Sequence, residues 1–239
     1  VLSRDAPKDF ALRLELLKDP TAFKVRYSFS INSAALVRVK KEITQLQKLT
    51  PQTHKSYSPA QMLAIAYPDR IGQRRKGQEQ RYLLSGGMGA HLSRPDPVGE
   101  NRFIVATELD GRKKEASIRR AISITKEEIR DLFANDFNFV KSCKWSKREG
   151  RVIAQQSEMF RALSISSRIW EDVPQEQIAK AIVEAIQYMG LALSDKEYAF
   201  LSRLAAAGPP FSDVTETYLQ NTLENWLLPF LENVVTAKE

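Results

Sequence analysis

The chain has 239 residues, of which 43% are hydrophobic, so it is long enough to bury one or two cores, and no apolar run approaches the roughly 18 residues of a membrane span. One cysteine excludes an internal disulfide, and two histidines argue against a zinc site. The net charge of +7 is uneven: residues 1–170 carry 32 Lys and Arg against 18 Asp and Glu, whereas residues 171–239 carry 4 against 11. A basic body predicts a polyanionic partner, with solvated charged faces as the alternative.

The chain before residue 73 is predicted to be helical. Residues 10–20, 34–49 and 58–68 repeat apolar side chains at helical spacing. Ser58 is the expected N-cap of the third helix, and Pro68 ends it. The second helix carries an amphipathic stripe that we expect to be buried, formed by Leu36, Val39, Ile43 and Leu46.

From about residue 81 the apolar period changes to that of strands. Residues 81–85, 102–111 and 115–125 are predicted strands, and Thr125 with Glu128 forms a capping box that starts one short helix. Three more strands are expected at 139–145, 151–160 and 162–167, the first two joined by a hairpin turn at 148–150. A small barrel with one inserted helix, similar to an OB-fold, fits this outline, and a β-sandwich fits it nearly as well.

Helices return after residue 170. Asp172 is the expected cap of a helix that ends at Gly190, and Ser194 with Glu197 forms a second capping box. Pro229 is expected to kink or split the last helix. Two apolar faces are expected to point inward: Ile178, Ile182, Ala185 and Met189 on the first helix, and Leu219, Leu223, Trp226, Phe230 and Val234 on the last. The predicted fold class is α+β, with domains 1–72, 73–170 and 171–239.

The glycine-rich stretch Ser85–His91 invites comparison with a phosphate-binding loop. A P-loop needs a Lys followed by Ser or Thr and then a helix, and neither follows here. Gly86, Gly87 and Gly89 therefore favour a turn between strands over an anion site. Because no nucleophile–histidine or metal-ligand pattern appears elsewhere, we expect no catalytic residue and no metal in this chain.

Basic residues gather in three clusters with interleaved aromatic rings, a pattern typical of single-stranded nucleic acid binding. The alternative is that the cations are solvated turn residues and the rings belong to the core. The first cluster lies beside Tyr82, the second marks a turn, and the third surrounds Trp145: Arg70, Arg74, Arg75, Lys76 and Arg81; Arg112, Lys113 and Lys114; Lys141, Lys144, Lys147, Arg148 and Arg151. We expect phosphate contacts from Arg70, Arg74, Arg75, Lys76, Arg81, Lys144, Lys147 and Arg148, with Tyr82 as a stacking candidate.

The stretches AYPDRIGQRR, RYLLSGGMGAHL and RFIVATELDG, followed by IVEAIQYMGLALS and LENWLLPFL, resemble the C-terminal region of HrpB-type bacterial ATP-dependent RNA helicases of the DEAH/RHA family. The resemblance runs from residue 10 to the end. It implies the end of a ratchet-type helical domain, an OB-like domain and a C-terminal helical segment. It also implies single-stranded RNA as partner, with DNA left open, together with RecA-like motor domains that would hold ATP and magnesium.

Two departures from the family pattern accompany the resemblance. Leu193 runs directly into residues 194–200, where the family usually has a Pro-Trp pair, and the chain stops soon after residue 231. We therefore expect a piece of a longer cytoplasmic protein whose acidic end is incomplete and exposes an apolar face. A free-standing nucleic-acid-binding module and a protein-interaction module, in which the acidic end docks a basic partner, remain the alternatives.

Overall fold

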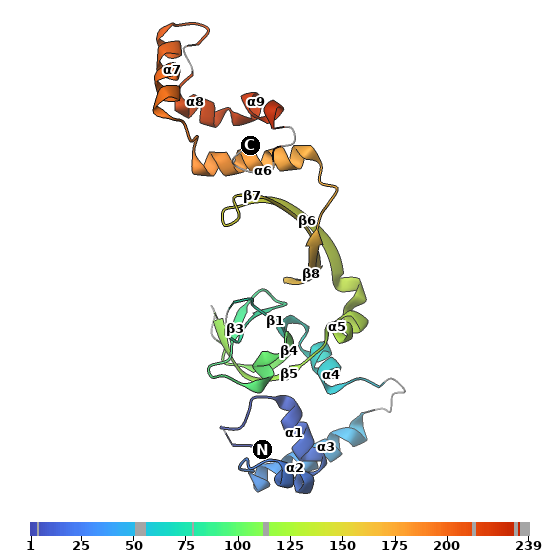
Figure 1. The fold of residues 1–239 in the computed structure, drawn as a ribbon. Coiled ribbons are helices and arrows are strands. Elements are labelled where there is room, and N and C mark those ends of the chain that lie inside the picture. The colour runs from blue at the N-terminus through green and yellow to red at the C-terminus, as the bar shows by residue number, and fades with distance from the viewer. Residues whose placement is uncertain are drawn as a thin grey trace. The chain divides into compact units, whose positions relative to one another are not determined.

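The computed structural model describes residues 1–3, 5–50, 56–77, 79–111, 115–211, 214–231 and 234 (Figure 1). The chain forms two compact units, the first made of residues 1–138 and 158–165, the second of residues 139–157 and 166–239. These units group the segments differently from the three domains expected from the sequence, which stay predictions. No helix of the described segments is long and apolar enough to cross a membrane.

Four helices begin the first unit, three where the sequence predicts them and one, directly after Asp19, that it did not predict. Asp19 ends one helix and caps the next, because its carboxylate accepts hydrogen bonds from the N–H groups of Thr21 and Ala22. Ser58 caps the fourth helix in a capping box, and a short 3₁₀ turn that starts at Pro68 follows it. The helices are α1 (Phe10–Lys18), α2 (Pro20–Arg26), α3 (Ser33–Leu49) and α4 (Pro59–Ala66).

The expectation that the apolar stripe of α3 is buried is wrong for this chain. No described residue of α3 is buried, and Leu46 is 63% exposed. The helix forms because its residues have the right propensity and Asn32 caps it, with the Asn32 side chain accepting from the N–H of Ala35. Amphipathic periodicity therefore predicted the helix correctly, but it did not say what covers the stripe.

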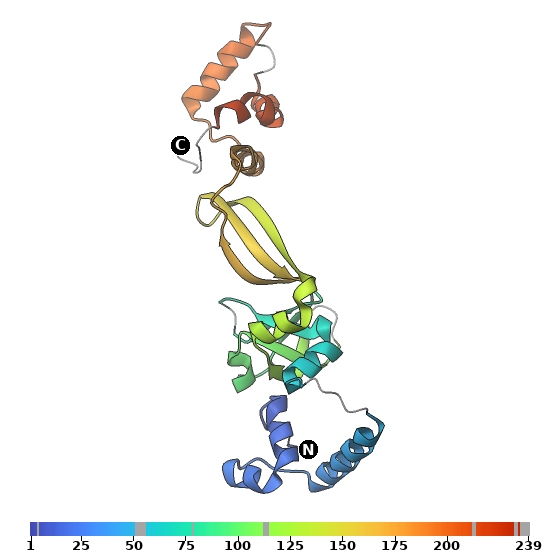
Figure 2. The same cartoon turned by 90° about the vertical axis from the view of Figure 1, so that its right-hand side faces the viewer.

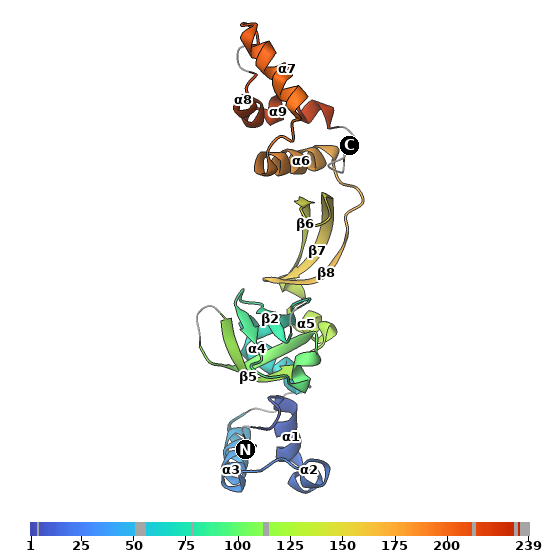
Figure 3. The same ribbon diagram turned by 60° about the vertical axis from the view of Figure 1, so that its left-hand side comes forward.

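Five strands close into the expected OB-like barrel in the order β1-β2-β3-β5-β4 (Figure 3). Neighbouring strands are antiparallel except for β3 and β5, which pair in parallel, and β1 closes the barrel against β4 through Gly72 and Ile104. The interior is apolar and includes Tyr82, Leu84 and Ile118. The strands are β1 (Ile71–Arg74), β2 (Arg81–Leu84), β3 (Gly89–His91), β4 (Phe103–Leu109) and β5 (Glu115–Ser123).

The first barrel strand contains residues that the sequence pattern does not reveal as a strand. Ile71 is its one large apolar side chain, so no alternation is visible beside the arginines. The glycine turn therefore joins β2 to β3, the second and third strands of the barrel. Gly87 has a φ of +89°, which confirms that the glycines serve a turn. The loop between β1 and β2 is residues 75–80.

A second apolar layer covers the outer face of the barrel. Helices α4 and α5 (Lys126–Phe133) lie beside the barrel (Figure 3). They pack with three side chains that point outward from it: Ile71, Phe103 and Val105. The capping box at Thr125 that starts α5 is confirmed. Residues 158–165 return to the same layer through Phe160, Leu163 and Ile165. Helix α5 follows the barrel instead of lying between its strands.

The three later strands form a sheet of their own in the order β6-β7-β8 (Figure 2). They cannot extend the barrel, because a closed barrel leaves no free edge to pair with. The predicted hairpin turn between the first two is confirmed. The strands are β6 (Phe137–Ser146), β7 (Arg151–Phe160) and β8 (Leu163–Ile169).

In the second unit, α6 (Gln175–Met189) packs on Trp145 and Val152 of the sheet and on the last helices. Asp172 is not its cap: the N-cap is Pro174, without a side-chain hydrogen bond. Met189 and Phe230 are 52% and 78% exposed, so their expected inward position is wrong. The last helix already breaks at Thr222, before Pro229. The remaining helices are α7 (Asp195–Ala206), with its predicted capping box, α8 (Glu216–Asn221) and α9 (Leu223–Trp226).

Candidate nucleic-acid interface

Three of the predicted phosphate contacts lie together at the end of β1 and in the β1–β2 loop. Arg74, Arg75 and Lys76 line an open cavity of about 690 Å³. Arg102, just before β4, is a fourth cation in the same wall, and it was not among the candidates from sequence. Its only sequence signal is its place before a buried strand. The remaining lining residues are Gln73, Gly77, Glu79 and Glu100.

Two cations of this cavity are held by protein partners. Arg74 donates to the carboxylate of Glu100 at 3.2 Å, and Arg102 donates to the backbone oxygen of Ile165 at 2.7 Å. Hydrogen bonds from Gln80 and then from Arg74 lower the pKa of Glu100. Arg75 and Lys76 are exposed, and no ion pair links them to any residue that the structure describes. These two cations are therefore free to meet a phosphate.

A buried amide fixes the loop that carries the cations. Gln80 donates from Nε2 to the oxygen of Asp96 at 2.9 Å and to Glu100 at 3.0 Å, and its Oε1 accepts from the N–H of Asp96 at 2.9 Å. Gly99 packs directly against this side chain: a Cβ at Gly99 would lie 2.4 Å from Cδ of Gln80. The amide thus joins the β1–β2 loop to residues 96–100.

We expect Gly99→Ala to lower the free energy of unfolding by about 1–3 kcal/mol, because the new methyl group must displace a hydrogen-bonded buried side chain. Urea denaturation of Gly99→Ala, Gln80→Ala and the double variant measures the coupling. Equal effects of Gly99→Ala with and without Gln80 would contradict this explanation.

The stacking role predicted for Tyr82 is wrong, because its ring is fully buried inside the barrel. The backbone oxygens of Gly99 and Asn101 both accept from the Tyr82 hydroxyl, at 2.8 Å and 3.0 Å. Burial raises the pKa of Tyr82 to about 12. Its position corresponds to the alternative considered from sequence, a core residue.

Arg70 and Arg81 belong to the same unit but are engaged elsewhere. Arg70 directly precedes β1, and its guanidinium lies 4.7 Å from the ring centre of Tyr67. Arg81 forms an ion pair with Glu115 at 3.0 Å and lines a neighbouring cavity. Both cations are therefore partly neutralised, and neither lines the cavity of Arg74 and Arg75.

Lys144, Lys147 and Arg148 lie in the second unit, on the β6–β7 hairpin. Lys147 sits 3.3 Å from the ring centre of Tyr188, and Arg148 pairs with Glu149 at 3.4 Å, whereas Lys144 is exposed. Trp145 is half-buried against α6 and is not a free ring. The cluster Arg112, Lys113 and Lys114 lies outside the described residues.

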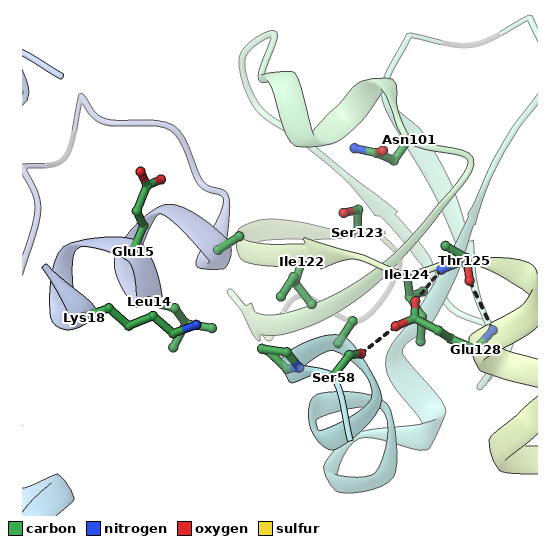
Figure 4. Close-up of a pocket in the computed structure, with 13 residues that line it drawn as sticks. Leu14, Glu15, Lys18, Ser58, Asn101, Ile122, Ser123, Ile124, Thr125 and Glu128 are labelled. Atoms are coloured by element: carbon green, nitrogen blue, oxygen red, sulfur yellow. Dashed lines mark hydrogen bonds between the residues drawn. The ribbon is translucent and has the colours of Figure 1, made fainter. Parts of the chain in front are cut away.

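A separate hollow of about 480 Å³ lies between α1, α4, β5 and the start of α5 (Figure 4). Leu14, Ile122 and Ile124 give it apolar walls, and Ser58 donates to Glu128 at its rim at 2.5 Å. Its charged lining residues are one cation, Lys18, and two carboxylates. This lining is unsuited to a polyanion.

The described residues contain no group of three His, Cys, Asp or Glu side chains that could hold a metal ion. Burial raises the pKa of the Cys143 thiol, which makes it a poor nucleophile. The arrangement that the residues do offer is an array of cations on a small barrel.

Comparison with known proteins gives one relationship by sequence. The chain is 26% identical over 185 residues to the ATP-dependent RNA helicase HrpB of Escherichia coli strain K12, covering 73% of this chain and 23% of the helicase. Two crystal structures of E. coli HrpB resemble it with 23% and 22% identity and TM-scores of 0.46 and 0.44; they cover 93% and 94% of this chain and 29% and 30% of those chains. No family model matches. The chain spans about a quarter of the curated relative. Over most of its length this chain is homologous to a region of HrpB, a helicase of the DEAH/RHA type.

Proposed function

We propose that this chain is an accessory RNA-holding region of an ATP-dependent RNA helicase. Its OB-like barrel binds the phosphates of single-stranded RNA, while RecA-like motor domains of a longer chain bind and hydrolyse ATP. Arg75 and Lys76 contact phosphates directly, and Arg74 and Arg102 shape the cavity and add to its positive potential. In this proposal, these residues bind RNA and take no part in ATP hydrolysis.

The cavity at the β1–β2 loop is the observation that carries this proposal. Four cations and two carboxylates line it, and the loop between the first two strands of an OB-fold is a usual oligonucleotide-facing position. The positive charge of residues 1–170 and the homology to part of a helicase support it. Electrostatic binding of this kind tracks the backbone and carries little sequence preference.

Fluorescence anisotropy of a labelled single-stranded RNA, titrated with the chain at several salt concentrations, tests the proposal. We expect Arg74→Ala/Arg75→Ala/Lys76→Ala to weaken binding by about 10- to 100-fold at low salt and to reduce the salt slope by about 1.4, because two direct phosphate contacts are lost and each contributes about 0.7 in a single strand.

The matched control is Lys40→Ala/Lys41→Ala/Lys48→Ala, which removes the same charge from exposed positions on α3 of the same unit. Wild-type affinity and slope are expected for this control. Equal losses of affinity in both triple variants would show that only net charge matters. An unchanged salt slope in Arg74→Ala/Arg75→Ala/Lys76→Ala would show that these residues do not contact phosphates.

One observation favours a second candidate, a protein-interaction module. The acidic segment 171–239 exposes large apolar side chains, among them Tyr188 at 75% and Phe200 at 54%. Saturable binding of a basic amphipathic peptide, without RNA binding at low salt, would favour this candidate. All three tryptophans lie in the second unit, so their fluorescence reports such binding there.

A further inference from the structure

The N-terminal segment and β5 form a second cationic cavity in the first unit, of about 830 Å³. Four cations line it, and Glu108 and Asp110 are its two carboxylates. None of these cations belongs to the three basic clusters of the sequence, because they come from separate stretches of the chain. They are Lys8, Arg13, Arg119 and Arg120.

Backbone contacts bring these distant residues together. The N–H of Ala121 in β5 donates to the oxygen of Lys8, so the N-terminal segment runs along the barrel wall. Arg13 donates to the backbone oxygens of Pro7 at 2.6 Å and Asp9 at 2.7 Å, which holds its guanidinium in place. Arg120 pairs with Glu108 at 3.4 Å. Arg119 is exposed and forms no ion pair within the described part of the chain.

The electrostatics of this cavity favour an anion. Burial lowers the pKa of Lys8, and the positive charges of Arg94 and Arg119 lower it further, against the opposing charge of Asp96. Burial also lowers the pKa of Arg13, with Arg120 as the next cause. Burial is the largest cause for both groups, and carboxylates offset part of the repulsion among the cations. A bound phosphate would relieve the repulsion.

Two smaller hollows lie between the second cavity and the cavity of Arg74 and Arg75, and each shares wall residues with the next. The Arg74 cavity shares Glu79 with a hollow lined by Ser93 and Arg94. That hollow shares Ser93 with one lined by Arg81 and His91, and His91 in turn lines the second cavity. A chain of adjoining hollows thus crosses the barrel within one unit.

The strand register gives this path its length. The N–H of Arg75 donates to the oxygen of Arg81, Arg81 pairs with His91, and His91 pairs with Ser117, so one row on the outer surface crosses from the β1–β2 loop to β5. Three inter-strand steps correspond to roughly 14 Å of barrel surface. The hydroxyls of Ser93 and Ser117, 2.6 Å apart, stand at the entrance of the second cavity and can bond a phosphodiester. An extended strand of a few nucleotides fits such a path.

We propose that this second cavity binds a phosphate of the same single-stranded RNA, several nucleotides from the phosphates held at the β1–β2 loop. The ligand class is a nucleic-acid phosphodiester, and Lys8 and Arg119 are the contacting cations. The inference rests on the proposed function and adds a second subsite to it.

Two labelled RNAs test the subsite: a dinucleotide, which is too short to span the path, and an RNA of about 12 nucleotides, which lies within the site sizes known for OB-folds. We expect Lys8→Ala/Arg119→Ala to weaken binding of the longer RNA roughly tenfold and to reduce its salt slope by about 1.4. Binding of the shorter RNA should change less than twofold, because it occupies the β1–β2 loop. Inorganic phosphate should not displace either labelled RNA from the protein.

Lys40→Ala/Lys41→Ala removes the same charge from α3 and is expected to leave both RNAs unaffected. Wild-type binding of the longer RNA by Lys8→Ala/Arg119→Ala would overturn the subsite alone, and equal weakening of both RNAs would also overturn it. Competition by phosphate would replace RNA with a free anion as the ligand. No binding of either RNA by the unaltered chain would overturn the proposed function as well. If the double variant does not fold, Arg119→Glu at an exposed position serves the same test.

Discussion

Tyr82→Ala is expected to lower the free energy of unfolding of the barrel by about 3–5 kcal/mol, as is typical when a fully buried aromatic side chain is removed. Tyr82→Phe keeps the ring and removes the hydroxyl, so it should cost only about 1–2 kcal/mol, from the hydrogen bonds to Gly99 and Asn101.

Hydrogen exchange of the barrel amides is the appropriate measurement for Tyr82, because it reports the first unit directly. The tryptophan fluorescence transition reports the second unit and should change little. The tyrosine also predicts a pH effect. Since burial raises the pKa of Tyr82 to about 12, its contribution to stability is complete below the unfolded pKa near 10. The contribution is lost as the pH rises toward 12, and Tyr82→Phe should remove this loss. Undiminished protection of the barrel in Tyr82→Ala would contradict its place in the core.

Phe160→Ala is expected to have an effect of the same size, about 3–5 kcal/mol, on the outer layer of the first unit. Phe160 is fully buried, and its ring centre lies 5.3 Å from those of Phe133 and Phe137. Residues 158–165 return to the barrel through this side chain, so its loss should weaken the hold of the segment as well as the layer beneath α5.

Phe139→Ala is the matched control, because Phe139 lies on β6 with 66% of its surface exposed. A change within about 0.5 kcal/mol is expected there. Urea denaturation of both variants, with hydrogen exchange of residues 71–74 and 103–105, measures the difference. Similar effects of the two substitutions would mean that the layer around Phe160 is not a core.

Local chemistry in the sequence was sufficient to predict most elements. Thr125 and Ser194 were expected to start helices through capping boxes and Ser58 was expected as an N-cap, and each caps its helix, because a cap depends on residues only three positions apart. The hairpin near Gly150 and the turn at Gly87 were predicted for the same reason, since a positive φ selects glycine wherever the turn lies in the fold.

Burial was predicted less well, because it depends on which partners cover a face. Leu46 of the α3 stripe and Met189 have the periodicity of buried residues and are exposed, and the rest of the stripe is only half-buried. Tyr82, among arginines, is buried. The short strand β1 was missed because Ile71 is its one large apolar side chain, and what makes it a strand is pairing with β2 and β4 across the barrel.

The sequence by itself showed that the body of the chain is basic, that cations are concentrated near residues 70–81, and that the chain is homologous to part of a helicase. Only the tertiary structure decided which cations share a wall. Arg102 joins Arg74 and Arg75 because β4 pairs with β1, and Lys8 meets Arg119 because the N-terminal segment runs along β5. Strand pairing joins residues distant in the chain, and charge in the linear sequence carries no record of that pairing.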